Sequence, residues 1–341
     1  MSALIGALSA LGSGRDLTVA QARDAVAQIM EGDASEVAIG GFLTALRVKG
    51  ESAEVLEGAV AAVRERSTLW GNPDATSPVL DTCGTGGDGA NTVNISTATA
   101  LVVAACGVAV AKHGNRSASG NSGSAEVLTE LGVRIDADIA ILRRCLAEVG
   151  ITFLFAPKFH PALRFAAPVR KVLPFRTLFN LVGPLANPAR PGFQLIGVPG
   201  ARLADLMARA LARLGIVRAA VVVGAEGLDE VSLGGPNSVR WVEHGHVSEL
   251  TWLPEDFNLP HGRSSDLRVD GPADSAAKLR AMLAGARGPI RDTVLANSAA
   301  ALLVAGRVSD LAEGVTIATL AIDDGAAAGL LERWARMSQG D

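Results

Sequence analysis

Cysteine is scarce in this chain, with three residues among 341. Cys83, Cys106 and Cys145 are odd in number, widely spaced and form no C-x-x-C pair. The sequence therefore predicts neither a disulfide framework nor a zinc site, and a reducing cytoplasm fits this cysteine usage.

An excess of basic residues is also missing, since the net charge is −4 and the isoelectric point is near 5.8. Proteins that bind nucleic acids or membrane surfaces usually carry more Lys and Arg than this, so neither partner is expected. The N-terminus has no basic region leading into a signal peptide. The most apolar segment, Ala98–Ala111, is too short to span a bilayer and is expected to form a buried helix and then a buried strand.

The chain has the composition of a folded globular protein, with 49% hydrophobic and 19% charged residues. Its length allows one large domain and a smaller one. Residues 1–70 read as purely helical: Thr18 with Gln21 forms a capping box, and Ser35 and Ser52 begin two more helices. The first of these three helices carries an apolar stripe that ends at Gly32.

A segment without periodicity, 71–78, follows the helical region and is interpreted as a hinge. Beyond it, short apolar runs alternate with helical patterns, which predicts a mostly parallel sheet flanked by helices. The fold class is therefore α/β, a small helical domain plus a larger α/β domain over 79–341. The strands are expected at Val79–Asp81, Val108–Ala111, Ile151–Phe155, Gln194–Gly197 and Ala219–Val223.

Two segments, Asp81–Thr97 and Lys112–Ser119, are rich in glycine and short polar side chains, and the second also contains the cations Lys112 and Arg116. Glycine backbones can bring N–H groups close to phosphate oxygens, so these segments are suited to binding a polyanion. The formal G-x-G-x-x-G match at Gly84 is not a dinucleotide fingerprint, because no carboxylate lies between Asp88 and Glu126 to bind a ribose. No Gly-Lys-Ser/Thr follows either, which excludes a Walker loop.

Several polar residues extend this predicted phosphate site. Thr92, Asn94, Ser96 and Thr97 lie where a helix starts and its N–H groups are free to bind phosphate, although plain helix capping is the alternative. Lys112 is expected at the carboxyl end of a strand, where open α/β sheets bind ligands. For Arg116 a structural ion pair is the alternative. Hydroxyl groups are added by Ser117, Ser119 and Ser124.

An adjacent acidic pair, Asp229-Glu230, follows the last predicted strand and a glycine-containing turn. Carboxylates at the carboxyl end of a strand suit Mg²⁺, which prefers oxygen ligands and keeps several waters. The alternative is an ordinary solvated acidic pair, which is common on protein surfaces.

The chain resembles the anthranilate phosphoribosyltransferases in six motifs that occur in the order of that family. These are Gly84–Gly89, Lys112–Ser117, His160–Ala162, Phe179–Ala189, Leu228–Ser232 and Asn297–Ala301. The resemblance covers nearly the whole chain. It implies transfer of a phosphoribosyl group to anthranilate in tryptophan biosynthesis, a cytoplasmic homodimer formed through the helical domain, Mg²⁺ as cofactor, and helices within about 158–190 that complete the helical domain.

The resemblance also implies roles for individual residues. Arg170 binds the anthranilate carboxylate, Asn115 faces the aromatic acceptor from the other side, and Gly84 belongs to the same site, with Gly183-Pro184 along its channel. Arg164 and Arg176 are rivals by residue type, and only the spacing of the family in Ala167-Pro-Val-Arg170 selects Arg170. Ser96, Asp229 and Glu230 hold the metal, and Lys112, Asn115 and Arg170 position substrates and stabilise charge. The residues expected around phosphoribosyl pyrophosphate are Gly84, Gly87, Asp88, Thr92, Asn94, Ile95, Ser96, Thr97, Lys112, His113, Gly114, Asn115, Arg116, Ser117, Ala118, Ser119, Gly120 and Ser124.

Some positions depart from the pattern of that family, namely Gly120, Asn121 and Glu126. They put a hydroxyl contact at position 120 and the affinity for pyrophosphate in doubt. For His113 and His160 a general base and a structural histidine both remain open, and His244, His246 and His261 are expected to be solvated.

Two alternative functions stay open at this point. Pyrimidine nucleoside phosphorylases have a related glycine-rich loop and Lys-His-Gly region, but the segment Asn180–Pro188 and Arg170 favour the transferase. A non-catalytic relative of the same fold that binds nucleic acid would carry a basic stripe, which the net acidic composition does not favour.

Overall fold

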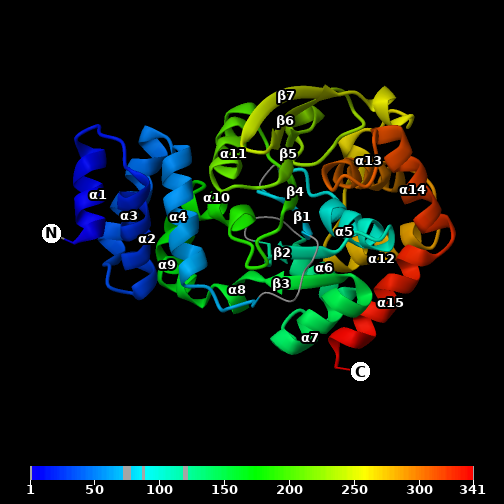
Figure 1. Ribbon diagram of the computed structural model, residues 1–341, viewed down its shortest axis with the longest axis horizontal. Helices are drawn as coiled ribbons and strands as arrows, with labels where there is room; N and C mark the ends of the chain where they lie inside the picture. The colour runs from blue at the N-terminus through cyan, green and yellow to red at the C-terminus, as the bar shows by residue number, and fades with distance from the viewer. Residues whose placement is uncertain (1, 72–77, 87–88, 118–121, 341) are drawn as a thin grey trace.

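The structure is a computed structural model that describes residues 2–71, 78–86, 89–117 and 122–340. A helical domain and a larger α/β domain lie side by side along the longest axis of the molecule (Figure 1). The expected fold class is confirmed. Most of the predicted hinge, residues 72–77, lies outside the described residues.

The helical domain begins with α1 (Ala3–Gly12), α2 (Val19–Glu31), α3 (Glu36–Lys49) and α4 (Ala53–Glu65). The predicted helix starts are confirmed, since Thr18 and Gln21 form the capping box of α2 and the hydroxyls of Ser35 and Ser52 cap α3 and α4. Later in the chain come α8 (Ala156–Phe159), α9 (Ala167–Val172) and α10 (Leu178–Leu185). Of these, α9 packs against α3, and α10 packs against α3 and α4, so this later segment lies against the helical domain.

One seven-stranded sheet forms the centre of the α/β domain, in the order β3-β2-β1-β4-β5-β6-β7. The first five of these strands are parallel, and β6 and β7 are antiparallel additions at one edge. The strands are β1 (Leu80–Gly84), β2 (Val110–Gly114), β3 (Ile151–Phe155), β4 (Phe193–Gly197), β5 (Arg218–Val223), β6 (Asn237–Glu243) and β7 (His246–Trp252).

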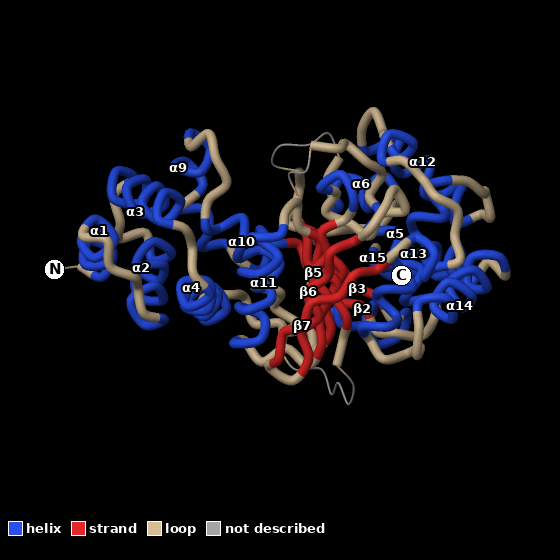
Figure 2. The backbone as a smooth tube through the Cα atoms, turned by 90° about the horizontal axis from the view of Figure 1, so that it is seen from above, coloured by secondary structure: helices blue, strands red, loops and turns tan. Residues whose placement is uncertain are grey.

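Helices cover both faces of this sheet (Figure 2). One face carries α5 (Ile95–Ala105), α6 (Ser124–Glu130), α12 (Pro272–Leu283), α13 (Pro289–Val304), α14 (Leu311–Asp323) and α15 (Ala326–Ser338), and the other carries α10 and α11 (Ala201–Arg213). Alternate residues of the central strands point into the cores on the two faces of the sheet. Leu195 and Val222 pack in the core under α5 and α13, and Ile196 and Val221 pack in the core under α10 and α11. Because both faces are buried, these strands read as continuous apolar runs. The α-helix α7 (Ile139–Arg144) continues into a π-helical turn, Cys145–Val149.

Two predicted strands, Val79–Asp81 and Val108–Ala111, end three residues too early. The strands β1 and β2 continue to Gly84 and Gly114, so Lys112 lies inside β2 rather than just after it. Their neighbours continue as well, with Lys112 paired to Phe153 and Gly114 to Phe155, and these backbone bonds extend the strand into its polar residues. Glycine-rich and charged sequence concealed this extension, because such residues are depleted in strands.

Within the described residues, no single helix is long and apolar enough to cross a membrane, and the bent pair α14 and α15 meets that criterion by length and composition only.

Candidate functional site

The glycine-rich loop meets the acidic pair at the carboxyl ends of β1 and β4. The N–H of Thr85 donates to the Gly197 carbonyl over 2.9 Å, and the N–H of Gly86 donates to Asp229 Oδ2 over 2.7 Å. A Cβ on Gly84 would lie only 2.7 Å from the same carboxylate oxygen. The loop therefore needs glycine to approach Asp229, although the two lie about 145 residues apart in sequence.

Ser96, Lys112 and Glu230 form the adjacent part of the site. Ser96, in the first turn of α5, donates its N–H to Glu230 Oε1 over 3.2 Å. Lys112 Nζ donates to Ser96 Oγ over 3.2 Å and to the Thr82 carbonyl. The three residues predicted to hold a metal are thus brought together with Lys112. Their donor atoms, two carboxylates and a hydroxyl, fit Mg²⁺ when substrate oxygens and water complete its shell.

The Lys112 ammonium is almost fully buried, with 1% of the residue exposed. Burial lowers the pKa of Lys112, while the nearby Asp81 carboxylate acts in the opposite direction. Burial also raises the pKa of Asp81 to about 6. Each group compensates part of the desolvation of the other, and hydrogen bonds to the Thr82 carbonyl and Ser96 Oγ hold Lys112 Nζ at the site.

Asn94 lies at the start of α5 but does not cap it with its side chain. Its Oδ1 accepts from the hydroxyls of Ser122, over 2.7 Å, and Ser275, over 2.9 Å. Plain capping is therefore the wrong alternative for Asn94. Ile95 and Thr97 are buried, and their N–H groups donate to the carbonyls of Val93 and Asn94, so their contact with a phosphate stays a prediction.

The second polar segment, after β2, folds back on α6. Ser124 Oγ donates to the Asn115 carbonyl over 3.2 Å, and the N–H of Ser117 donates to Glu126 Oε2 over 3.4 Å. Glu126, one of the unusual residues, thus helps to hold this segment. The Arg116 guanidinium lies 5.9 Å from the Phe155 ring centre. Thr92, another predicted residue, forms an isolated antiparallel β-bridge with Arg268. The positions that lie outside the described residues are Gly87, Asp88, Ala118, Ser119, Gly120 and Asn121.

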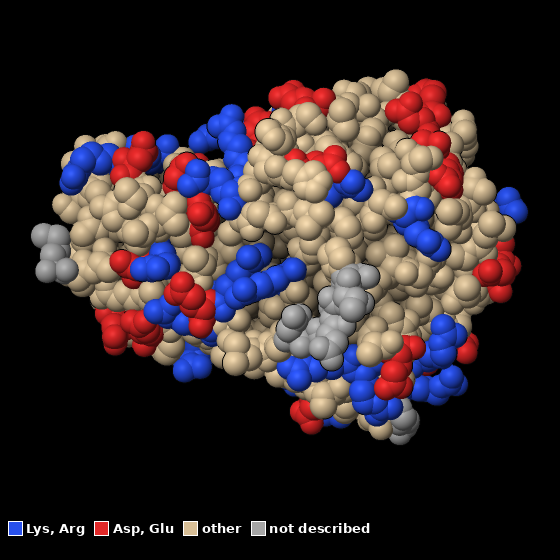
Figure 3. Space-filling model, viewed as in Figure 1, with Lys and Arg blue, Asp and Glu red and all other residues tan. Residues whose placement is uncertain are grey.

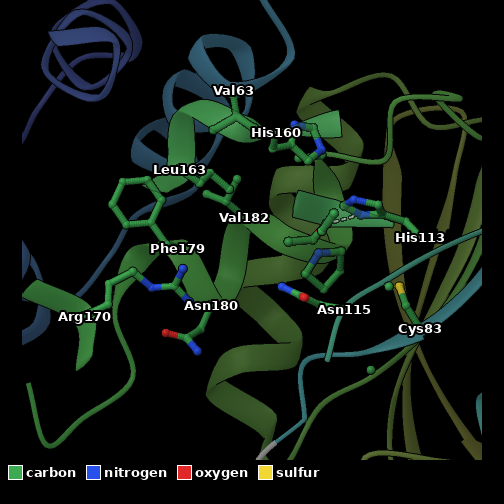
Figure 4. A pocket seen from close by; sticks show the side chains of 16 residues that line it. Val63, Cys83, His113, Asn115, His160, Leu163, Arg170, Phe179, Asn180 and Val182 are labelled. Carbon is green, nitrogen blue, oxygen red and sulfur yellow. Dashed lines mark hydrogen bonds between the residues drawn. The ribbon is translucent and has the colours of Figure 1, made fainter. Parts of the chain in front are cut away.

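A cavity of about 180 Å³ lies next to this site, between the helical and α/β domains (Figure 4). Arg170 and Asn115 point toward one another across it. Gly84, Gly183 and Pro184 also line it. The remaining lining is mainly apolar: Val63, Cys83, His113, Gly114, Ala156, His160, Leu163, Phe179, Asn180, Val182 and Ala186.

Arg170 is distinguished from its rivals by position. Its guanidinium is mostly buried, which lowers its pKa, and lies 5.8 Å from the Phe179 ring centre. Its Nε is buried without a hydrogen-bond partner among the described residues, and Arg170 lines the cavity. Arg164 instead stacks on Phe165, and Arg176 donates to the Thr85 carbonyl of the glycine-rich loop. Neither of them lines the cavity.

Two buried histidines form one wall of the cavity. His113 Nδ1 donates to the Gly183 carbonyl over 3.0 Å, and the His113 and His160 rings meet edge to face with centres 5.2 Å apart. Burial lowers the pKa of His113 to about 3 and that of His160 to about 4. Both rings are neutral at pH 7 and too weakly basic for efficient general-base catalysis, which favours the structural interpretation. The solvated histidines, His244, His246 and His261, are exposed as predicted.

The buried histidines His113 and His160 make the stability of the fold depend on pH. A histidine whose folded pKa lies below its unfolded value of about 6.5 stabilises the protein fully above pH 6.5, and this contribution is lost as the pH falls toward the folded pKa. Below pH 6.5 each such histidine is expected to reduce the unfolding free energy by about 1.4 kcal/mol per pH unit. Urea unfolding at pH 7.5, 6.5 and 5.5 measures this. His160→Gln should have a slope smaller by that amount, and His261→Gln should not; equal slopes for wild type and His160→Gln would contradict the assignment.

Sequence reasoning missed a buried network behind the cavity. Asn187 donates its amide N–H groups to Asp81 Oδ2 and to the Ala111 carbonyl, both over 2.8 Å, while Asp81 Oδ1 accepts from the N–H of His113. This network fixes the segment after α10 against β1 and β2. The signal was an aspartate inside an apolar strand, which requires a partner. Phe179 and Asn180 were also missed, although they lie one helical turn from Gly183-Pro184.

Basic side chains gather beside the hollow between the two domains (Figure 3), although the rest of that face carries both charge signs. An anionic ligand is therefore favoured there despite the net negative charge.

The sequence matches two family descriptions, "Glycosyl transferase family, helical bundle domain" over residues 6–67 and "Glycosyl transferase family, a/b domain" over 76–328. Anthranilate phosphoribosyltransferase 2 of Streptomyces coelicolor is 50% identical, covering 95% of this chain and 96% of that protein. Anthranilate phosphoribosyltransferase of Chloroflexus aggregans is 48% identical, covering 98% of each chain.

Solved structures agree with these relatives. The anthranilate phosphoribosyltransferase of Thermus thermophilus has a TM-score of 0.91 and 39% identity, covering 99% of this chain and 100% of that one. The Saccharomyces cerevisiae enzyme in complex with PRPP and Mg has a TM-score of 0.91 and 28% identity, covering 99% and 98%. Another structure of the yeast enzyme contains 4-fluoroanthranilate, with a TM-score of 0.89 and 28% identity, covering 99% and 98%.

Proposed function

Because the chain belongs to the anthranilate phosphoribosyltransferase family of glycosyl transferases, we propose that the two adjoining parts of its site bind the two substrates of that reaction. The enzyme transfers the phosphoribosyl group of 5-phosphoribosyl 1-pyrophosphate to the amine of anthranilate, which gives N-(5-phosphoribosyl)anthranilate and pyrophosphate. This is the second step of tryptophan biosynthesis from chorismate. The neighbourhood of Ser96, Lys112, Asp229 and Glu230 supports the assignment of the pyrophosphate end.

The main chemical requirement is to stabilise the departing pyrophosphate. As the bond from C1 of the ribose breaks, positive charge develops on the sugar and negative charge on the leaving oxygens. Lys112, which donates to Ser96 Oγ, contributes positive charge next to such oxygens. Bound Mg²⁺, held by Ser96, Asp229 and Glu230, would neutralise charge on the same oxygens.

Anthranilate enters the cavity lined by Arg170 and Asn115. A guanidinium binds a planar carboxylate through two parallel hydrogen bonds, and the unpaired Nε of Arg170 is a suitable donor. The apolar walls then bury the aromatic ring. The amine of anthranilate carries a lone pair at neutral pH and attacks C1 without a strong base, in keeping with the low pKa values of His113 and His160. Catalysis rests on positioning and charge neutralisation.

Three further properties belong to this proposal. A homodimer through the helical domain is supported by large apolar residues exposed on α3 and α9: Val37, Val48 and Val172 are 87%, 83% and 79% exposed.

Closure about residues 71–78 would bring the two substrates together, and compaction in solution scattering when both substrates bind would support it. The cytoplasm is the proposed location, on the cysteine usage.

Anthranilate fluorescence tests the function directly. Protein, anthranilate, Mg²⁺ and phosphoribosyl pyrophosphate are mixed, and the emission of anthranilate should disappear with time. Inorganic phosphate with a pyrimidine nucleoside should give no free base, as expected if the phosphorylase alternative is wrong. Persistent emission with folded protein would remove the proposal.

Replacement of Arg170 by leucine should raise KM for anthranilate by about 10- to 150-fold, since one charge-assisted interaction contributes about 1.5–3 kcal/mol. KM for phosphoribosyl pyrophosphate should change little, because Arg170 lies in the other part of the site. Arg164→Leu, which removes a neighbouring guanidinium outside the cavity, is the matched control. Steady-state kinetics with each substrate varied distinguishes the two variants, and equal effects on both KM values would contradict the assignment.

A further inference from the structure

The backbone that follows Asp229-Glu230 is held by two buried asparagines. Asn297, in α13, accepts the Val231 N–H on Oδ1 and donates from Nδ2 to the Val231 carbonyl, both over 2.9 Å. Asn237, the first residue of β6, accepts the Ser232 N–H over 2.7 Å and donates to the Ser232 carbonyl over 2.9 Å. Each side-chain amide thus pairs with both backbone groups of one residue, as a neighbouring strand would.

Both amides are held in a single orientation. Asn297 Nδ2 also donates to the Thr293 carbonyl over 2.9 Å, and Asn237 Nδ2 to the Trp252 carbonyl over 3.2 Å. Asn237, Asn297 and Val231 are fully buried, and Ser232 is 4% exposed. A buried backbone group that loses its partner cannot turn to water, so the loop has no inexpensive alternative position.

Two glycines approach the backbone of the same loop closely. A Cβ on Gly197, at the end of β4, would overlap the Asp229 carbonyl, and one on Gly224 would overlap the Glu230 carbonyl. The backbone of the acidic pair is therefore packed directly against the ends of β4 and β5. The glycine contacts at residues 229–230 and the asparagine hydrogen bonds at residues 231–232 together fix the backbone path of 229–232.

We propose that Asn237 and Asn297 are positioning residues that hold the carboxylates of Asp229 and Glu230 for Mg²⁺ bound together with pyrophosphate oxygens. This inference rests on the proposed function of that acidic pair. Adjacent carboxylates follow their backbone, so a displacement at Val231 moves both. The proposal gives Asn297, the first residue of the motif Asn297–Ala301, the role of positioning the acidic pair. Groups that orient metal-binding carboxylates typically change metal affinity or activity about 10- to 100-fold when removed.

The test uses Asn297→Ala with Ser298→Ala as its matched control. Ser298 is the next residue on the same helix, equally buried, and its hydroxyl has no hydrogen-bond partner within the part of the chain that the structure describes. Calorimetric titration with phosphoribosyl pyrophosphate over a range of Mg²⁺ concentrations measures the coupled binding. Amide hydrogen exchange over residues 228–233 measures the loop without any turnover.

For Asn297→Ala, the Mg²⁺ concentration for half-maximal binding is expected to rise about 10- to 100-fold. Exchange over 228–233 should accelerate, and KM for anthranilate should stay unchanged. Ser298→Ala should match the wild type in all three measurements. Faster exchange with an unchanged Mg²⁺ requirement would overturn the inference, because the asparagine would then serve only stability.

Two further variants guard against failure to fold. The first is Asn297→Ser, which keeps a smaller polar group, and the second is Asn237→Ala, on a different element. For both we expect a higher Mg²⁺ requirement and faster exchange over 228–233, and faster exchange with an unchanged Mg²⁺ requirement would again overturn the inference. The proposed function fails in a different way, since wild-type protein would then show no Mg²⁺-dependent binding of phosphoribosyl pyrophosphate.

Discussion

Replacing Asp229 and Glu230 together with alanine is expected to lower kcat/KM for phosphoribosyl pyrophosphate by about 150- to 25,000-fold. Each carboxylate makes a charge-assisted hydrogen bond to a backbone N–H of the site, Asp229 to Gly86 and Glu230 to Ser96. At about 1.5–3 kcal/mol for each charged group, the pair accounts for about 3–6 kcal/mol of transition-state stabilisation. The initial rate of anthranilate consumption, with the sugar substrate varied, measures the loss.

The matched control is the adjacent acidic pair Glu255-Asp256, which is exposed and lies in the 3-10 helix Pro254–Phe257. Its double alanine variant removes the same two charges from the chain and should keep kcat/KM within about twofold of the wild type, as surface substitutions usually have small effects. Unaltered turnover in the Asp229/Glu230 variant would refute the assignment of the pyrophosphate site.

Lys112→Met is expected to reduce turnover by about 10- to 150-fold and to destabilise the fold as well. The catalytic loss reflects one charge-assisted interaction, about 1.5–3 kcal/mol. The stability loss, about 1–3 kcal/mol, arises because the buried Thr82 carbonyl loses its donor and the buried Asp81 carboxylate loses its nearby cation. Kinetics at a temperature well below the unfolding transition, and urea unfolding in parallel, measure the two effects separately.

Lys278→Met serves as the control for loss of a lysine. Lys278 forms an ion pair with Asp274 one turn away on α12 and is partly exposed. Surface ion pairs contribute about 0–1 kcal/mol, so this variant should be close to wild type in both measurements. A Lys112→Met enzyme that is less stable but fully active at low temperature would show that Lys112 supports the fold alone.

The hairpin of β6 and β7 shows where prediction from sequence ended. Six of the seven residues of β7 are exposed, so the strand lacks the apolar alternation that identifies a half-buried strand. Its turn uses His244 and Gly245, both with positive φ, and only the glycine is a usual signal for such a turn. Because Asn237 begins this hairpin, its role beside the acidic pair was hidden as well.

The cavity shows a second limit, which is one of distance along the chain. Val63, His113, Arg170 and Gly183 come from four different elements, and the pattern around each residue describes only its own helix or strand. Motif resemblance selected Arg170 over Arg164 and Arg176 by spacing. Only the packing of α9 and α10 against α3 and α4 showed that Arg170 reaches the cavity while the other two contact Phe165 and Thr85.

The sequence by itself determined the local features of this protein. Capping residues such as Thr18 and Ser52 start helices through bonds to N–H groups three residues away, and apolar runs such as Ile151–Phe155 form buried strands because both of their faces lie in a core. Tertiary structure alone decided which distant groups became partners: Ser96 with Glu230, Gly86 with Asp229, and Asn297 with Val231. Such pairs form because a parallel sheet aligns the carboxyl ends of its strands at one edge, and a buried amide or carboxylate must find its hydrogen bonds there.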